Sequence, residues 1–205
     1  MKKVLFTVMF LVFVSVSVAA FAVESVEVAE KWNVGVNTSV VFPEDEAAGT
    51  GVNVMGLVSY DVYKYAAVGV EVGYTTYEID TLGVDWGRVN SMPIMGDVIL
   101  KYPLELGDYL FVPYVTNGFG CLLTNVDESD TVNRAGISFE TDPAFLYKLG
   151  GGFDFYVTKN IAVSFETSYL WAAQTWRAKV SGTSAAEESL SADALYLGGG
   201  LKIKF

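Results

Sequence analysis

The sequence alternates between apolar and polar residues, with a period of two, in one segment after another from residue 31 to the end. In the clearest segment, Val68, Val70 and Val72 alternate with Gly69 and Glu71. Because successive side chains of a strand point to opposite faces, this alternation predicts strands with one apolar and one polar face. Eight segments follow the pattern: residues 31–42, 51–62, 66–77, 92–102, 111–124, 145–156, 161–171 and 195–205. In the fifth segment a slip of one residue would exchange the faces, and Asn117 falls on its apolar face.

The gaps between these segments alternate strictly in length. Long polar gaps cover residues 43–50, 78–91, 125–144 and 172–193, and short gaps cover residues 63–65, 103–110 and 157–160. An antiparallel up-and-down barrel gives this order when both chain ends lie on the side of the short turns. We therefore expect an all-β fold, an eight-stranded antiparallel up-and-down β-barrel with four long loops at the end opposite the termini.

The polar faces carry glycine, serine and charges of both signs, four acids against four bases. These charged residues are Glu71, Asp97, Lys101, Lys148, Asp154, Glu166, Lys202 and Lys204. Balanced charges among small residues are typical of a packed polar interior, where buried ions need partners. We therefore predict a transmembrane barrel in which these eight side chains form a charge network that fills the lumen, with a conducting pore as the alternative. A soluble lipocalin-like barrel, with its apolar faces inside, is a further alternative.

The amino terminus has the pattern of a secretory signal peptide. Two lysines precede an apolar run from Val4 to Val14, and Ala20-Phe21-Ala22 fits the small-residue cleavage pattern. We predict a signal peptide over residues 1–22, a short periplasmic lead-in over residues 23–30 and a barrel domain over residues 31–205. An uncleaved membrane anchor is the alternative reading of the leader.

Composition argues against several classes of function. The net charge of −11 and the absence of a basic patch disfavour binding to nucleic acid. The chain has no histidine, so the commonest general base and metal ligand are missing, and its single cysteine cannot form an internal disulfide. We predict no catalytic, cofactor or metal site, and no enzyme activity.

Two stretches resemble a known superfamily. The segment Pro93-Ile94-Met95 to Lys101-Tyr102-Pro103, followed by Val112-Pro113-Tyr114-Val115 and Gly118-Phe119-Gly120, is similar to a recurring pattern of outer-membrane β-barrel domains, which include OmpA-like and OmpW-like proteins. The closing segment, which ends on Phe205, resembles the last strand of such barrels. Asn117 stands where the family usually has a small residue.

This resemblance implies a location in the cell outer membrane, in contact with its lipid. It also implies that Phe205 is an assembly signal, read by the barrel-insertion machinery after periplasmic chaperones have delivered the chain. Three function classes remain at this point: a structural or surface-interaction barrel, a narrow channel for small apolar or ionic solutes as in OmpW-like proteins, and a soluble ligand carrier. The sequence names no small-molecule ligand.

Overall fold

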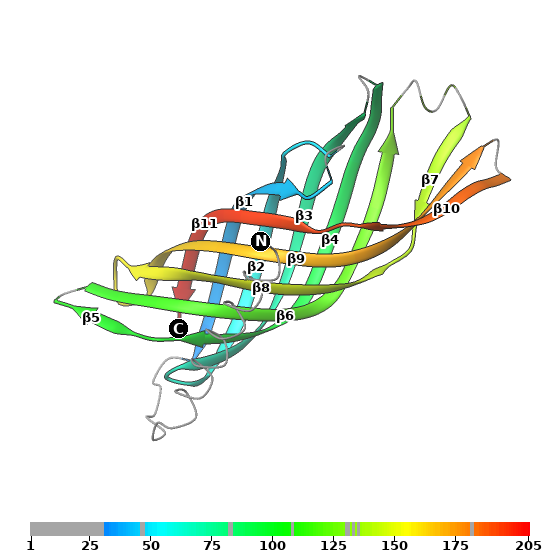
Figure 1. Ribbon diagram of the computed structural model, residues 1–205. Coiled ribbons are helices and arrows are strands. Elements are labelled where there is room, and N and C mark those ends of the chain that lie inside the picture. Colours follow the sequence, from blue (N-terminus) through cyan, green and yellow to red (C-terminus); the bar gives the residue numbers. More distant parts are fainter. Residues whose placement is uncertain are drawn as a thin grey trace, which may run out of the picture.

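The chain forms a closed β-barrel in the computed structural model, which describes residues 31–45, 48–81, 84–107, 109–129, 132, 134, 136–180 and 183–205. Eight strands, each antiparallel to its neighbours, close the ring in the order β1-β2-β3-β4-β6-β8-β9-β11-β1 (Figure 1). Their bounds are β1 Trp32–Pro43, β2 Gly51–Tyr63, β3 Ala66–Thr81, β4 Val84–Lys101, β6 Tyr109–Glu128, β8 Ala144–Tyr156, β9 Ile161–Val180 and β11 Ala194–Lys204. The predicted fold is confirmed. No helix in the described part of the chain is long and apolar enough to cross a membrane.

Three further strands lie outside the ring. Strand β5 (Leu104–Leu106) pairs with β6, while β7 (Ile137–Thr141) and β10 (Thr183–Ser191) pair with the outer half of β9. The first described strand and the carboxy terminus meet at one end of the barrel, where the backbones of Trp32 and Phe205 exchange hydrogen bonds of 3.0 and 2.9 Å. We call this the terminal end and the opposite one the loop end. The predicted signal peptide and lead-in lie outside the described residues.

Three of the four gaps predicted as long loops contain paired strand, and this part of the prediction is wrong. Strands β3 and β4 stay paired out to Thr81 and Val84, β6 runs to Glu128, and β9 runs to Val180 with β10 beside it. The predicted short turn over residues 103–110 likewise contains β5. Strand pairing uses backbone groups, so it continues where the sequence no longer alternates between an apolar and a polar face. The strands therefore project beyond the barrel at the loop end (Figure 1).

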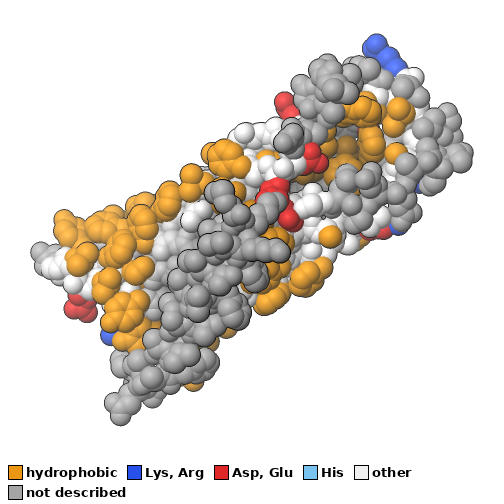
Figure 2. Space-filling model, viewed as in Figure 1, with side chains coloured by type: hydrophobic (Ala, Val, Ile, Leu, Met, Phe, Trp, Pro, Cys, Tyr) orange, Lys and Arg blue, Asp and Glu red, His pale blue; other side chains and the backbone are white. Residues whose placement is uncertain are grey.

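The apolar faces point outward. Val36, Val70 and Phe119 each keep more than half of their surface exposed, whereas inward-pointing Lys148 and Asp97 are 0% and 3% exposed. Figure 2 shows apolar side chains spread over the visible barrel wall. Continuous apolar surface of this extent needs a nonaqueous partner, and a lipocalin-like barrel would have the opposite faces. The soluble-carrier alternative is therefore wrong.

The structure decides which face of strand β6 points into the lumen, which the sequence left open. Tyr114, Thr116 and Gly118 point inward and are buried, which leaves Asn117 on the outer, apolar face. Its amide Nδ2 donates a 2.7 Å hydrogen bond to the hydroxyl of Tyr147 on the neighbouring strand. This bond gives the Asn117 amide a partner in a setting where an unpaired polar group would be costly.

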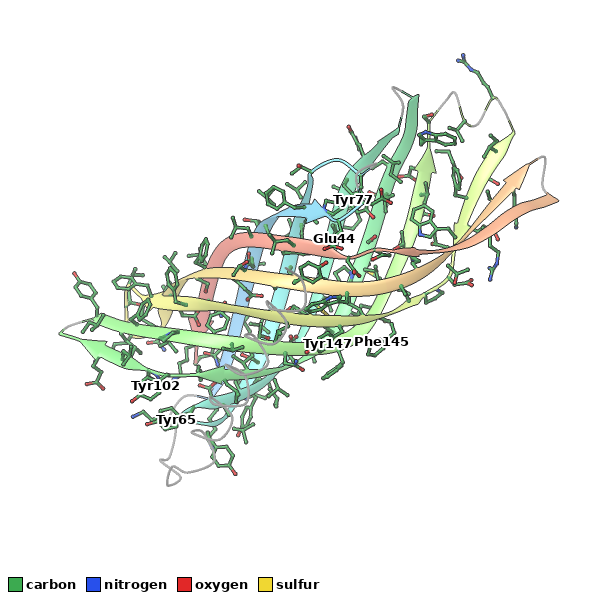
Figure 3. All side chains as sticks on the ribbon, viewed as in Figure 1. Glu44, Tyr65, Tyr77, Tyr102, Phe145 and Tyr147 are labelled. Carbon is green, nitrogen blue, oxygen red and sulfur yellow. The ribbon has the colours of Figure 1, made fainter. Side chains whose placement is uncertain are left out.

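Aromatic side chains gather at two levels of the outer wall. Near the terminal end, Tyr65 and Tyr102 stack with their ring centroids 5.6 Å apart (Figure 3). Nearer the loop end, Tyr147 lies 5.3 Å from Trp171. At the level of the terminal end, Phe155 of β8 stacks on Tyr109. With a rise of about 3.3 Å per residue and a tilt of about 40°, β8 spans about 20 Å along the barrel axis from Tyr147 to Phe155. This height is close to the apolar band of about 25 Å in outer-membrane barrels.

The lumen contains apolar layers as well as charges. One layer, near the loop end, is built from nine buried residues: Val41, Met95, Leu122, Ala144, Leu146, Leu170, Ala172, Ala194 and Tyr196. A second one comprises Leu57, Ala67, Ile99 and Tyr114. The prediction of a purely polar lumen is incomplete. Apolar layers lie between the charged groups, and the burial of their side chains stabilises the packed interior.

Candidate functional site

Four charged side chains meet in the middle of the lumen. Lys148 projects from β8, and its ammonium lies 2.5 Å from Glu71 Oε2 of β3, 3.2 Å from Asp97 Oδ1 of β4 and 3.5 Å from Glu166 Oε1 of β9. We call these four residues the central cluster. They come from four strands, so the cluster ties opposite walls of the barrel together.

Small and polar neighbours make room for the central cluster. A Cβ on Gly118 would lie 2.5 Å from Asp97 Oδ1, so only glycine leaves that oxygen in place. The Thr116 hydroxyl donates a 3.2 Å hydrogen bond to the same oxygen. The hydroxyl of Tyr114 donates to Glu166 Oε2 at 2.9 Å. A buried ion pair is tolerable only when its remaining lone pairs find donors, and these neutral groups supply them for Asp97 Oδ1 and Glu166 Oε2. Asp97 Oδ2 is buried without a hydrogen-bond partner among the described residues.

Two smaller charge groups lie toward the terminal end. Asp61 of β2 accepts a hydrogen bond from Lys101 Nζ at 2.5 Å and one from Asn33 Nδ2 at 3.1 Å, with Lys204 Nζ 3.8 Å away. Lys202 Nζ contacts both carboxylate oxygens of Asp154, at 2.9 and 3.1 Å. The same ammonium lies 4.2 Å from the ring centroid of Tyr114. Tyr114 thus connects this pair with the central cluster.

All eight residues predicted to form the charge network point into the lumen, in three groups. Glu71, Asp97, Lys148 and Glu166 meet in the central cluster, Asp154 pairs with Lys202, and Lys101 and Lys204 converge on Asp61. The sequence analysis missed Asp61 and Tyr114. Asp61 lies on the polar face of its alternating segment, so the signal that selected the others was present. Tyr114 could not be selected in this way, because a tyrosine is common both on lipid-facing and on lumen-facing sides of a strand.

Phe205 lies at the terminal end beside β1. Its backbone amide donates to the carbonyl of Trp32 at 2.9 Å, and the amide of Trp32 donates back to Phe205 at 3.0 Å. The Phe205 side chain is 60% exposed. The last residue thus completes the pairing of the first and last strands and leaves its ring accessible.

Two cavities open on either side of the filled part of the lumen. The larger, of about 500 Å³ at the loop end, is lined by apolar and aromatic side chains that include Trp86, Phe139 and Trp176. Figure 2 shows this hollow lined with apolar atoms. The other, of about 280 Å³ at the terminal end, is lined by charged residues such as Lys101 and Lys204 and also by apolar ones such as Ile99 and Val112.

Between the two cavities lie the central cluster and the nine-residue layer that contains Leu146, which we call the apolar layer. One pocket of about 30 Å³ lies beside the cluster. Among the described residues, no group of three or more cysteines, aspartates or glutamates is arranged to hold a metal ion. Lys148 is the cation at the point where the three carboxylates of the central cluster meet.

A family model for the outer membrane protein beta-barrel domain matches residues 8–205. This chain belongs to that family. The barrel is accordingly a protein of the cell outer membrane, and its apolar wall faces lipid. A comparison with curated proteins finds no match.

Solved structures of small outer-membrane barrels share the fold. The outer membrane protein OprG from Pseudomonas aeruginosa has a TM-score of 0.70 at 12% identity, over 86% of this chain and 96% of that one. Neisserial surface protein A has a TM-score of 0.61 at 15% identity, over 87% and 100%. The outer membrane protein W of E. coli has a TM-score of 0.54 at 15% identity, over 88% and 100%. At these identities the likeness concerns the fold alone.

Proposed function

We propose that this outer-membrane barrel has a structural or surface-interaction role and that its lumen is closed to solutes. The observation that carries the proposal is Lys148, which is fully buried and held by carboxylates from three other strands. An eight-stranded barrel is just wide enough inside for side chains to fill. The apolar layer between the central cluster and the loop-end cavity adds a second barrier.

Solute entry into proteoliposomes tests this closed state. We expect vesicles with the folded barrel to take up a small sugar or a monovalent ion no faster than protein-free vesicles. A pore-forming protein reconstituted at the same density provides the positive control. Entry that rises in proportion to the amount of folded barrel would favour the narrow channel instead.

The loop-end cavity supports a second candidate function, the capture of small apolar molecules. Its volume of about 500 Å³ is within the range of ligand pockets, which are mostly apolar and carry a few polar groups. Trp86, Phe139 and Trp176 supply aromatic walls from β4, β7 and β9, with Trp86 6.3 Å and Trp176 6.5 Å from Phe139 between ring centroids. The cavity ends at the apolar layer, so this candidate concerns binding rather than passage through the lumen.

The four tryptophans allow this binding to be separated from partition into lipid. Trp86 and Trp176 line the cavity, whereas Trp32 and Trp171 belong to the aromatic contacts of the wall. In a Trp32→Phe/Trp171→Phe barrel, a brominated apolar molecule should quench fluorescence with saturation. In the matched Trp86→Phe/Trp176→Phe barrel, the quenching should rise linearly, as expected for partition. If quenching were equal in the two barrels and did not saturate in either, the loop-end cavity would not bind the apolar molecule.

For biogenesis, we propose that residues 1–22 are removed on export and that the insertion machinery recognises Phe205. The exposed ring of Phe205 at the terminal end supports this role. Phe205→Ser keeps the backbone hydrogen bonds to Trp32 but removes the ring, so it should lower the amount of folded barrel in the outer membrane while refolding in detergent changes little. Unchanged assembly in cells would argue against the signal.

A further inference from the structure

The charges of the lumen do not balance. Among the described residues, the three charge groups contain five carboxylates and four ammonium groups. The carboxylates are Asp61, Glu71, Asp97, Asp154 and Glu166, and the ammonium groups are those of Lys101, Lys148, Lys202 and Lys204. The net excess is one negative charge (five minus four). The central cluster, where three carboxylates share Lys148, has two negative charges in excess, and Asp61 with its two lysines has one positive charge in excess. Unpaired buried charge is expensive, so this excess calls for a counter-charge.

A small pocket lies next to this excess. It measures about 30 Å³ and is lined by Glu71 and Glu166 together with neutral oxygen-bearing side chains, among them Asn37, Ser39 and Ser164. About 10–15 Å³ is enough for one water molecule, so the pocket has room for a small ion with little of its hydration shell. Glu166 is also the carboxylate held least closely by Lys148, at 3.5 Å.

Two oxygens of this pocket's lining residues have no hydrogen-bond partner among the described residues. They are Ser164 Oγ and Asn37 Oδ1, both buried as atoms, and Ser164 is 3% exposed as a residue. An amide oxygen and a hydroxyl oxygen with free lone pairs, beside two carboxylates, form the all-oxygen environment that hard cations prefer. A proton would bind to a single carboxylate oxygen and leave the other oxygens without a partner. A metal cation contacts several oxygens at once. Lys202 also lines the pocket, but its ammonium is held by both oxygens of Asp154.

We propose that this pocket binds one small monovalent cation, such as Na⁺, between Glu71 and Glu166, with Ser164 Oγ and Asn37 Oδ1 as further ligands. One positive charge brings the lumen to neutrality. A single charge also suits a site with two carboxylates that are already shared with Lys148. The inference goes beyond the closed lumen, because it concerns an ion held in place, and its failure would leave the solute-entry result unaffected.

Thermal unfolding of the folded barrel in non-ionic detergent tests the site. The melting temperature is compared in NaCl and in the chloride of a large organic cation, N-methylglucamine, at equal ionic strength. We expect it to rise with Na⁺ by about 4 °C for each tenfold increase above the dissociation constant, and to stay flat in the organic salt. Charged groups on the surface experience both salts alike, so the difference reports a site that admits only small ions.

Two variants locate the effect. Glu166→Gln leaves four carboxylates against four ammonium groups, so the dependence on Na⁺ should disappear. Ser164→Ala keeps the charge and removes one oxygen, so the response should move to higher Na⁺ concentration. Ser59→Ala is the matched control, because Ser59 is equally buried in the lumen but lines the terminal-end cavity instead. It should respond to Na⁺ like the unmodified barrel.

Three results would overturn the proposal. The first is an equal melting temperature in both salts, which would assign the counter-charge to a proton. The second is a dependence on Na⁺ that survives in Glu166→Gln, and the third is an identical response of Ser164→Ala and Ser59→Ala. If Glu166→Gln fails to fold, the comparison of the two serine variants decides the question alone.

Discussion

At the scale of single residues, the lumen is organised around one lysine. Lys148 has no exposed surface and contacts three carboxylates, whereas Lys101 has one close carboxylate, and its side chain is 14% exposed. Removing one partner of a buried charge group leaves the others uncompensated, and this costs more than the pair itself contributes. The more deeply a lysine is buried, the more its replacement should lower the free energy of unfolding.

We expect Lys148→Met to lower the free energy of unfolding by about 3–5 kcal/mol, or to prevent folding. Lys101→Met should cost less, because Asp61 keeps its hydrogen bond from Asn33 and its nearby Lys204. Exposed Lys159, replaced by Met, should leave stability within about 0.5 kcal/mol. Urea unfolding in lipid vesicles, followed by tryptophan fluorescence, measures all three. Equal stability of the Lys148 and Lys159 variants would contradict this ranking.

The outer wall has a polar pair whose value can be measured by a double-mutant cycle. Tyr147→Phe leaves the Asn117 amide without its partner in lipid and should cost about 1–3 kcal/mol. Asn117→Leu added to Tyr147→Phe replaces both polar groups and should recover most of that loss. If the double variant were as unstable as Tyr147→Phe, the hydrogen bond would not be the cause.

At the scale of the strands, the sequence predicted the buried part of each element better than its ends. The alternation of Val68, Val70 and Val72 with Gly69 and Glu71 places β3 correctly, because lipid on one side and a packed lumen on the other impose two different faces. Beyond Tyr77 the wall leaves that environment, and the signal fades although pairing continues as far as Thr81. The register of β6 stayed ambiguous because Asn117 breaks the pattern, and its partner Tyr147 is visible only in the fold.

Glycines on the two faces of the strands should differ in their tolerance of a side chain. A Cβ on inward-pointing Gly152 would lie 2.0 Å from the carbonyl oxygen of Phe165 on β9, whereas one on Gly96 would have no neighbour within 4 Å. Gly152→Ala should therefore cost about 1–3 kcal/mol by forcing β8 and β9 apart. Gly96→Ala, on the outer face of β4, should be neutral or slightly stabilising. Urea unfolding compares the two, and equal losses would contradict the register.

At the scale of the whole molecule, the barrel combines an apolar exterior with a lumen that is both charged and apolar. Most of the charged residues could be predicted, because acids and bases recur on the faces that carry glycine. Their division into three groups could not, since it depends on the heights at which distant strands meet: Glu71 and Lys148 are far apart in sequence but 2.5 Å apart in space. The loop-end cavity was also beyond prediction, because Trp86, Phe139 and Trp176 fall in gaps that carry no face pattern.

The central claim is that the side chains of the lumen close it, and planar-bilayer conductance tests this claim most directly. The unmodified barrel should insert without conductance steps. A variant with Glu71, Asp97, Lys148 and Glu166 replaced by serine, and with Met95, Leu146 and Leu170 of the apolar layer replaced by alanine, keeps the wall but removes both barriers. Where it folds, it should show small conductance steps. Steady conductance of the unmodified barrel, at the same level as this variant, would contradict the account.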